Sequence, residues 1–263
     1  MKMVKKILFG AVALAAVLSL ASCGMKDDDE GAITGAGNTY KVKYENSDKD
    51  NNYRAYKSTT FKHAGALVKV TFNKTDIGAS KMGVIFGLTE NKSADGKSKT
   101  RDFYIIGLGT LDKSNFYVSK YTNIADIQAE NFGATTTAKD TEPKEVELVK
   151  LSDANSITLP AKADDGSISV YIWYQAQLDG SYKWAVLSLT DDQVKLWDKA
   201  TGAIPAGATT IREGTIKDAF TAVTDAKDLP QYPISVYSMI KPAQSVDGQW
   251  KIVGTYKEAE DAE

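Results

Sequence analysis

The stretch ISVYIWYQAQLDGSYKWAVLSL, residues 168–189, decides the fold class. Two runs rich in β-branched and aromatic residues, 168–177 and 182–189, flank the dipeptide Asp179-Gly180. Such runs favour pleated strands, and Asp-Gly favours a tight turn because both residues tolerate positive φ angles. We therefore expect an antiparallel β-hairpin closed by a two-residue loop.

Similar runs lie on both sides of this hairpin, separated by short polar turns. The expected strands are residues 67–72, 82–88, 103–108, 116–121, 234–240 and 250–256. Helical patterns are short and cover residues 119–129, 191–200, capped by Asp191 or Asp192, and 216–223. Many short strands with few helices predict an all-β fold, an antiparallel β-sandwich of jelly-roll type.

The expected hairpin has two different faces. A two-residue loop pairs Gln175 with Trp184 and Trp173 with Val186. One face is then apolar, and the other carries the candidate ligand-binding residues Tyr171, Trp173, Gln175, Gln177, Tyr182 and Trp184. Aromatic rings stack on the C–H faces of sugars and amides bind hydroxyls, so this face suits a carbohydrate. In the alternative, the sheet is buried on both sides and these rings belong to the core.

The first 23 residues carry the pattern of an export leader. A basic start is followed by the apolar run 7–20 and by Leu20-Ala21-Ser22-Cys23. The run is short for a membrane span, and small residues precede the cut site. The tetrad resembles the lipobox of bacterial lipoproteins, which implies a signal peptide over residues 1–22 and lipidation of Cys23. Acyl chains on Cys23 would anchor the protein to a membrane without a transmembrane helix.

Residues 23–38 are expected to be an acidic and glycine-rich tether, and residues 39–263 the β-sandwich body, with 202–212 as a candidate internal linker. Lys26 and the acidic residues 27–30 resemble the surface-export signal of lipoproteins in the Bacteroidota, although spirochaete lipoproteins carry similar tethers. The resemblance implies an outer-membrane lipoprotein exposed at the cell surface. A periplasmic location is the alternative.

Composition excludes several kinds of site. The chain has one histidine, His63, one cysteine, Cys23, and three arginines, Arg54, Arg101 and Arg212. These numbers exclude intramolecular disulfides, histidine-rich metal centres and arginine clusters for phosphate. Removing the three leader lysines from the 32 basic residues leaves 29 against 34 acidic ones, a net charge of −5, so we expect no nucleic-acid binding. No cofactor is expected, but Asp164-Asp165 and Asp191-Asp192 leave a structural calcium ion open.

Residues 53–190 resemble the concanavalin-A-like jelly-roll group, which includes legume-type lectins, laminin-G modules and laminarinase-type hydrolases. The resemblance rests on ALVKVTF (66–72), GVIFGL (83–88), DFYIIG (102–107) and the paired aromatic strands. It implies a sandwich whose concave sheet binds carbohydrate. Laminarinase-type members carry a Glu-x-Asp-x-x-Glu strand. The nearest stretch here, Glu145-Val146-Glu147, lacks the aspartate and the third carboxylate, and we expect it to be a solvent-facing edge strand.

The sequence therefore predicts a lipid-anchored, non-enzymatic lipoprotein that binds carbohydrate or acts as an adhesin. One alternative is a glycoside hydrolase or lyase on a jelly roll, and another is a structural or assembly subunit that binds a protein. The expected partners are the membrane and a glycan or a surface protein. We expect His63 at the surface and a solubilising hairpin tip formed by Lys92, Lys97, Lys99 and Arg101.

Overall fold

The computed structural model describes residues 33–47, 49–50, 53–73, 81–92, 98–109, 117–125, 144–149, 159–240 and 242–258. The predicted signal peptide, Cys23 and the acidic run 27–30 lie outside these residues. Within the described ranges, no helix is both long and apolar enough to cross a membrane.

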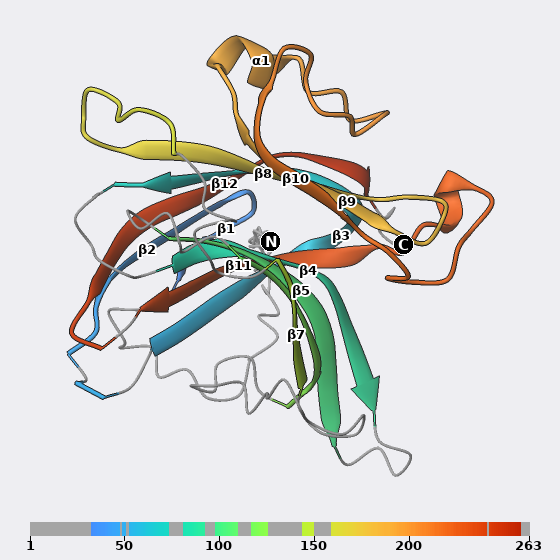
Figure 1. The fold of residues 1–263 in the computed structure, drawn as a ribbon, viewed down its shortest axis with the longest axis horizontal. Helices are drawn as coiled ribbons and strands as arrows, with labels where there is room; N and C mark the ends of the chain where they lie inside the picture. Colours follow the sequence, from blue (N-terminus) through green and yellow to red (C-terminus); the bar gives the residue numbers. More distant parts are fainter. Residues whose placement is uncertain are drawn as a thin grey trace, which may run out of the picture.

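Strands dominate the described chain (Figure 1). They are β1 (Thr34–Ala36), β2 (Thr39–Glu45), β3 (Tyr53–Phe72), β4 (Lys81–Lys92), β5 (Lys99–Gly109), β6 (Tyr117–Ile124), β7 (Lys144–Val149), β8 (Ile168–Ala176), β9 (Tyr182–Ser188), β10 (Thr209–Ile216), β11 (Tyr232–Ile240) and β12 (Ser245–Glu258). The helices of the described chain are α1 (Asp191–Lys195) and the 3-10 turn η3 (Ala226–Asp228). The pairings between these strands are antiparallel. The predicted all-β, antiparallel fold with few short helices is therefore confirmed.

The long strand β3 belongs to two layers. Its residues 53–63 pair with β11, whereas residues 63–72 lie between β12 and β8. The first layer therefore has the order β1-β2-β12-β3-β8-β9-β10, and the second has the order β3-β11-β4-β5-β6-β7. Each layer turns one face toward the other, and the opposite face of each layer is called its outer face below.

The core lies between the two layers. Phe86 of β4 stacks on Tyr174 of β8 with ring centroids 4.5 Å apart, and both rings are buried. Trp250 of β12 is fully buried and donates its indole N–H to the Gly83 carbonyl of β4 at 3.0 Å. This bond satisfies the single donor of a large apolar side chain and joins the layers directly.

Two of the expected helices are strand or coil. Residues 119–124 belong to β6, because its aromatic residues pair with those of β5: the Phe103 and Tyr121 rings stack at 5.2 Å. Residues 217–223 form no helix, and the amides of Ala219 and Phe220 donate to the Gly180 carbonyl instead.

The third expected helix, 191–200, is confirmed only over α1. Its N-cap is Thr190 and not Asp191 or Asp192, because Thr190 and Gln193 form a reciprocal capping box. The helix stops at Lys195, and the chain continues as coil and turns to Ala208.

The sheet extends beyond the expected start of the body. Ile33 is buried, and β1 pairs with β2, so the folded part includes residues that the sequence assigned to the tether. The candidate linker 202–212 overlaps β10, which pairs with β9. β11 and β12 lie inside the two layers, so the chain after residue 212 completes the same sandwich.

Candidate functional site

The β8–β9 hairpin forms where the sequence predicted it, but its register differs by one residue. Trp173 pairs with Ala185, and Gln175 pairs with Lys183. The Gly180 amide donates to the Gln177 carbonyl at 3.1 Å, and the Gln177 amide donates to the Ser181 carbonyl at 2.8 Å. The loop therefore has three residues, 178–180, and not two.

The conformation of the loop explains its length. Gly180 has a φ of +85°, whereas Asp179 has no positive φ. The Asp179 carboxylate accepts hydrogen bonds from the amide and hydroxyl of Ser181, at 3.0 and 2.6 Å, and these bonds hold its pKa below the ordinary value. A turn followed by one left-handed glycine is the usual three-residue hairpin, whereas a two-residue turn of the expected type needs two positive φ angles.

The change of register divides the predicted site between two faces, so the expectation of one face carrying all six residues is wrong. Tyr182 and Trp184 point into the core with Tyr174, and both are buried. Tyr171 and Trp173 lie on the outer face with Ala185 and Leu187. A slip of one residue reverses the side on which every residue of a strand lies, which is the physical reason for the error.

The outer half of the predicted site is covered by the segment 189–208, called the cover segment here. Figure 1 shows α1 and the following coil above the first layer. The Trp173 indole N–H donates to the Gly202 carbonyl at 2.7 Å, and the Gln175 amide donates to the Thr201 carbonyl at 2.7 Å. Trp173 is only 5% exposed, so it belongs to a small second core in this structure. A ligand-binding role for the six predicted residues stays a prediction.

Trp197 fixes the cover segment to β12. Its ring lies directly on Gly254, where an added Cβ would come within 2.1 Å of the indole nitrogen. Val194 and Ile204 pack against the same apolar cluster. This close approach requires glycine at position 254. The cover segment and β12, which are far apart in the sequence, are therefore packed tightly together.

A polar surface remains on the outer face of the first layer, beside the cover segment. It is called the polar face here and consists of Lys41, Lys43, Lys69, Thr71, Ser169, Asp247, Gln249 and Lys251. Of these residues, Lys41, Lys43 and Lys251 are exposed, Thr71 is buried, and the others are half-buried. In β2, β12 and β3 these residues alternate with the core residues Val42, Trp250 and Val70. The alternation of a half-buried strand therefore places all eight on one side of the sheet.

The pairing of the strands orders the polar face into rows. One row runs Lys41, Gln249, Thr71 and Ser169, and a neighbouring row runs Lys251, Lys69 and Tyr171. The hydroxyls of Thr71 and Ser169 lie 2.9 Å apart and share a hydrogen bond. The Lys69 ammonium lies 5.8 Å from the centre of the Tyr171 ring. The polar face is thus a grid of cations, amides and hydroxyls on a rigid sheet.

The outer face of the second layer is buried and aromatic. Its cluster contains Ile85, Phe103, Tyr117, Tyr121 and Tyr237. The Lys81 ammonium lies 4.5 Å from the Tyr117 ring centre. The Ser119 hydroxyl is buried on this face and has no hydrogen-bond partner among the described residues. These residues provide packing and not an accessible surface.

The carboxylates proposed for calcium have local partners. Asp165 accepts from the Ser167 amide at 2.9 Å and shapes a turn, and hydrogen bonds from Ser167 lower its pKa. Asp192 lies in the first turn of α1, 2.8 Å from Lys195. Among the described residues, no group of three or more His, Cys, Asp or Glu side chains could hold a metal ion.

The strand that contains Glu145 and Glu147 is β7, at the edge of the second layer. Val146 and Leu148 are 39% and 40% exposed, in line with the expected edge strand. The side chains of Glu145 and Glu147 lie outside the described part of the structure.

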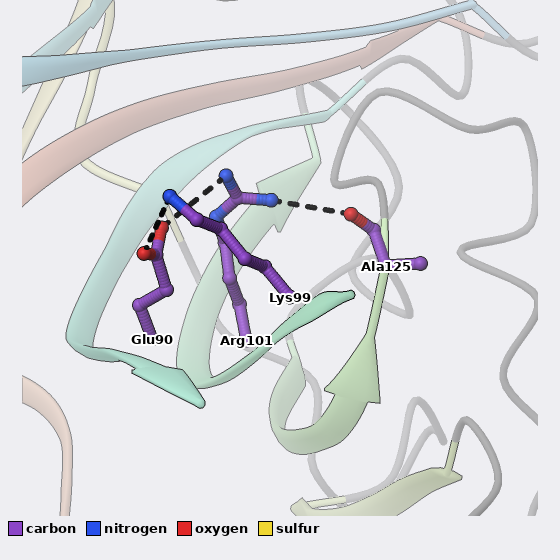
Figure 2. A network of polar contacts seen from close by, with 4 residues as sticks. All are labelled: Glu90, Lys99, Arg101 and Ala125. Carbon is purple, nitrogen blue, oxygen red and sulfur yellow. Dashed lines mark hydrogen bonds and ion pairs between the residues drawn. The ribbon is translucent and has the colours of Figure 1, made fainter. Parts of the chain in front are cut away.

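The expected solubilising tip of the β4–β5 hairpin is held by ion pairs (Figure 2). The Glu90 carboxylate lies 3.0 Å from Lys99 and 3.8 Å from Arg101, and Arg101 also donates to the Ala125 carbonyl at 3.2 Å. The Lys99 hydrogen bond is the main cause that lowers the pKa of Glu90. Because these cations already have partners, they are poor candidates for an anion site. Lys97 lies outside the described residues.

The expectation of a surface position for His63 is wrong. His63 is 2% exposed and lies where β3 passes from one layer to the other. Neither ring nitrogen has a hydrogen-bond partner among the described residues, and the ring lies 5.1 Å from that of Phe61. Burial lowers the pKa of His63 to about 4, because charging it would cost solvation.

Comparisons with known proteins show likeness only to solved structures. No family model matches the chain, and no curated protein matches it. A legume lectin-like domain from Entamoeba histolytica shares 11% identity at a TM-score of 0.37, over 84% of this chain and 87% of that one. A β-glucanase from Bacillus licheniformis shares 9% identity at a TM-score of 0.31, over 83% of this chain and 91% of that one.

The polar face was not predicted from the sequence, although the sequence carries a signal for it. Residues 39–45, TYKVKYE, alternate strictly between polar and apolar residues, as a half-buried strand does. This pattern places Lys41 and Lys43 on one side of a strand. On the side of the polar face, however, the neighbour of β2 is formed by residues 245–251, and only the fold shows that pairing.

Proposed function

We propose that this protein is a lipid-anchored, non-enzymatic carbohydrate-binding protein of the outer membrane, held by Cys23, that binds its ligand on the polar face. The observation that carries the proposal is the grid of amide, hydroxyl and ammonium groups on the outer face of the first layer, with exposed lysines beside the half-buried Gln249 and Ser169. Each of these groups forms hydrogen bonds with hydroxyls or carboxylates, which are the groups that a polysaccharide presents.

The regular spacing of polar groups on a sheet suits an extended polymer. Neighbouring strands lie about 4.8 Å apart, and alternate residues along a strand lie about 6.7 Å apart, so polar groups recur at spacings close to that of a sugar ring. β12, β3 and β8 are paired with a strand on each side, so little backbone conformational freedom is lost on binding. Gln249 and Ser169 flank Thr71 in the same row and supply neutral donors and acceptors.

The Asp247 carboxylate of the polar face has a structural role in the sheet, and the other acid on this face, Glu45, lies at the end of β2. Hydrolysis of a glycosidic bond normally uses two carboxylates about 5–10 Å apart. Asp247 instead accepts a hydrogen bond from the Asn73 amide at 2.7 Å and pairs across the strands with Lys43. Its environment is that of a structural acceptor beside a cation.

The anchor is tested with Cys23→Ser. Lipidation needs the thiol, so we expect the variant to lose metabolic labelling by palmitate and to leave the membrane fraction. Whole-cell fractionation and protease shaving of intact cells measure both properties for the native chain and the variant. Native protein in the soluble fraction, or unchanged membrane retention of Cys23→Ser, would contradict the lipid anchor.

Carbohydrate binding is tested by calorimetric titration of the full-length protein in detergent with a panel of neutral and charged polysaccharides. We expect saturable binding to at least one of them. Gln249→Ala with Ser169→Ala removes two hydrogen-bonding groups and should weaken that binding about tenfold. The control Gln231→Ala with Thr221→Ala removes an amide and a hydroxyl outside the polar face. No saturable binding, or equal losses in the two variants, would overturn the proposal.

A further inference from the structure

Four lysines are concentrated on the polar face. Lys41 and Lys43 are alternate residues of β2, and Lys251 lies on the neighbouring strand β12. Lys251 pairs directly with Lys69 of β3. Lys41, Lys43 and Lys251 are exposed, and Lys69 is half-buried. The side chains therefore project together from three adjacent strands.

None of these four ammonium groups is neutralised by an ion pair among the described residues. Lys99, Lys195 and Lys227, in contrast, each have an acidic partner. Like charges directly opposite each other on a sheet destabilise it, and Lys69 and Lys251 are such a pair. The Lys69 ammonium lies near the Tyr171 ring and Lys43 lies opposite Asp247, but Lys41 and Lys251 make no ion pair or ring contact among the described residues.

The acidic groups on the same face do not balance the lysines. Asp247 pairs with Lys43 across the strands, and Glu45 lies at the end of β2. The whole chain has a net charge of −2, so a positive surface is a local feature of an acidic protein. A concentration of one sign of charge favours a ligand of the opposite sign.

We propose that the polar face selects anionic polysaccharides, which carry carboxylate or sulfate groups along the chain. The inference rests on the proposed function and adds the class of ligand. The lysines neutralise the anionic groups, while the half-buried Gln249 and Ser169 bind the hydroxyls between them. Lysine suits this role because its compact ammonium accepts several anion geometries, whereas the arginine fork prefers one planar anion.

The neutral groups favour a polysaccharide over a membrane surface. A protein that lies on anionic lipids inserts apolar or aromatic side chains beside its cations. On the polar face, the nearest aromatic residue, Tyr171, is buried and does not project. Lys41 shares its row with the Gln249 amide and the Ser169 hydroxyl, and these neutral groups suit the hydroxyls of a sugar chain.

The test compares two quadruple variants of the full-length protein. The first changes Lys41, Lys43, Lys69 and Lys251 to glutamine. The matched control makes the same change at Lys62, Lys162, Lys199 and Lys217, which are exposed elsewhere. Polygalacturonate, dextran sulfate, neutral dextran and phosphatidylglycerol vesicles are the probes. We expect the first variant to bind the two anionic polysaccharides about 30-fold more weakly, and the control to change by less than about threefold.

The outcomes separate the two proposals. A native protein that binds dextran as tightly as polygalacturonate overturns the anionic selection and leaves carbohydrate binding intact. A protein that binds no polysaccharide overturns both. Binding to the vesicles but not to the polysaccharides identifies the polar face as a membrane contact and also overturns the inference. Circular dichroism verifies folding, and the single variants Lys69→Gln and Lys251→Gln repeat the test if the quadruple variant is unfolded.

Discussion

Replacing Trp173 by alanine lowers the free energy of unfolding by about 3–5 kcal/mol. The side chain is 5% exposed and packs with Leu67, Ala185 and Leu187 beneath the cover segment. The substitution removes the ring, leaves a cavity and deprives the Gly202 carbonyl of its donor. Guanidinium unfolding, followed by far-ultraviolet circular dichroism, measures the change.

A second substitution at position 173 separates the contribution of the ring from that of its N–H group, and a substitution at Leu178 is the control. Trp173→Phe keeps an aromatic ring but loses the N–H donor, so it should cost less than the alanine variant. Leu178→Ala, at a side chain that is 44% exposed, should change stability by less than about 0.5 kcal/mol. If Trp173→Ala has the same guanidinium unfolding midpoint as the native protein but loses polysaccharide binding, the ring is a ligand contact. The cover segment then does not pack on the ring in solution.

The local part of the fold follows from the sequence. The runs around Val70, Ile105 and Ile172 are rich in β-branched and aromatic residues, and all lie in strands as predicted. Asp179-Gly180 correctly marked the end of β8 and the start of β9. These features depend on neighbours within a few residues, which is why a single sequence predicts them.

The candidate site depends on longer-range geometry. One additional loop residue, Leu178, moved Trp184 from the expected face into the core. Trp173 is covered because residues 189–208 return over β8, and no local pattern specifies that packing. The polar face brings together β2 and β3, from the first third of the chain, and β12, from its last residues. Pairing between distant strands therefore decided which side chains remained accessible.

Acidification from pH 6.5 to pH 4 should remove about 3 kcal/mol of stability through His63 alone. The pKa of His63 falls from 6.5 to about 4 because the folded chain buries it without a hydrogen-bond partner among the described residues. Between pH 6.5 and pH 4, the His63 side chain binds a proton in the unfolded state but not in the folded state. The contribution is therefore fully present above pH 6.5 and is lost as the pH falls toward 4.

The difference between native protein and a His63 variant isolates this effect. Glu90, Asp165 and Asp179 have lowered pKa values and lose their own contributions at lower pH, but they do so in both proteins. His63→Phe and His63→Leu cannot be protonated, so the gap between their stability and that of the native chain should shift by about 3 kcal/mol across the window. Urea unfolding at half-unit pH steps measures it. A parallel pH dependence in all three proteins would mean that His63 reaches water, and with it that the junction where β3 passes between the layers opens in solution.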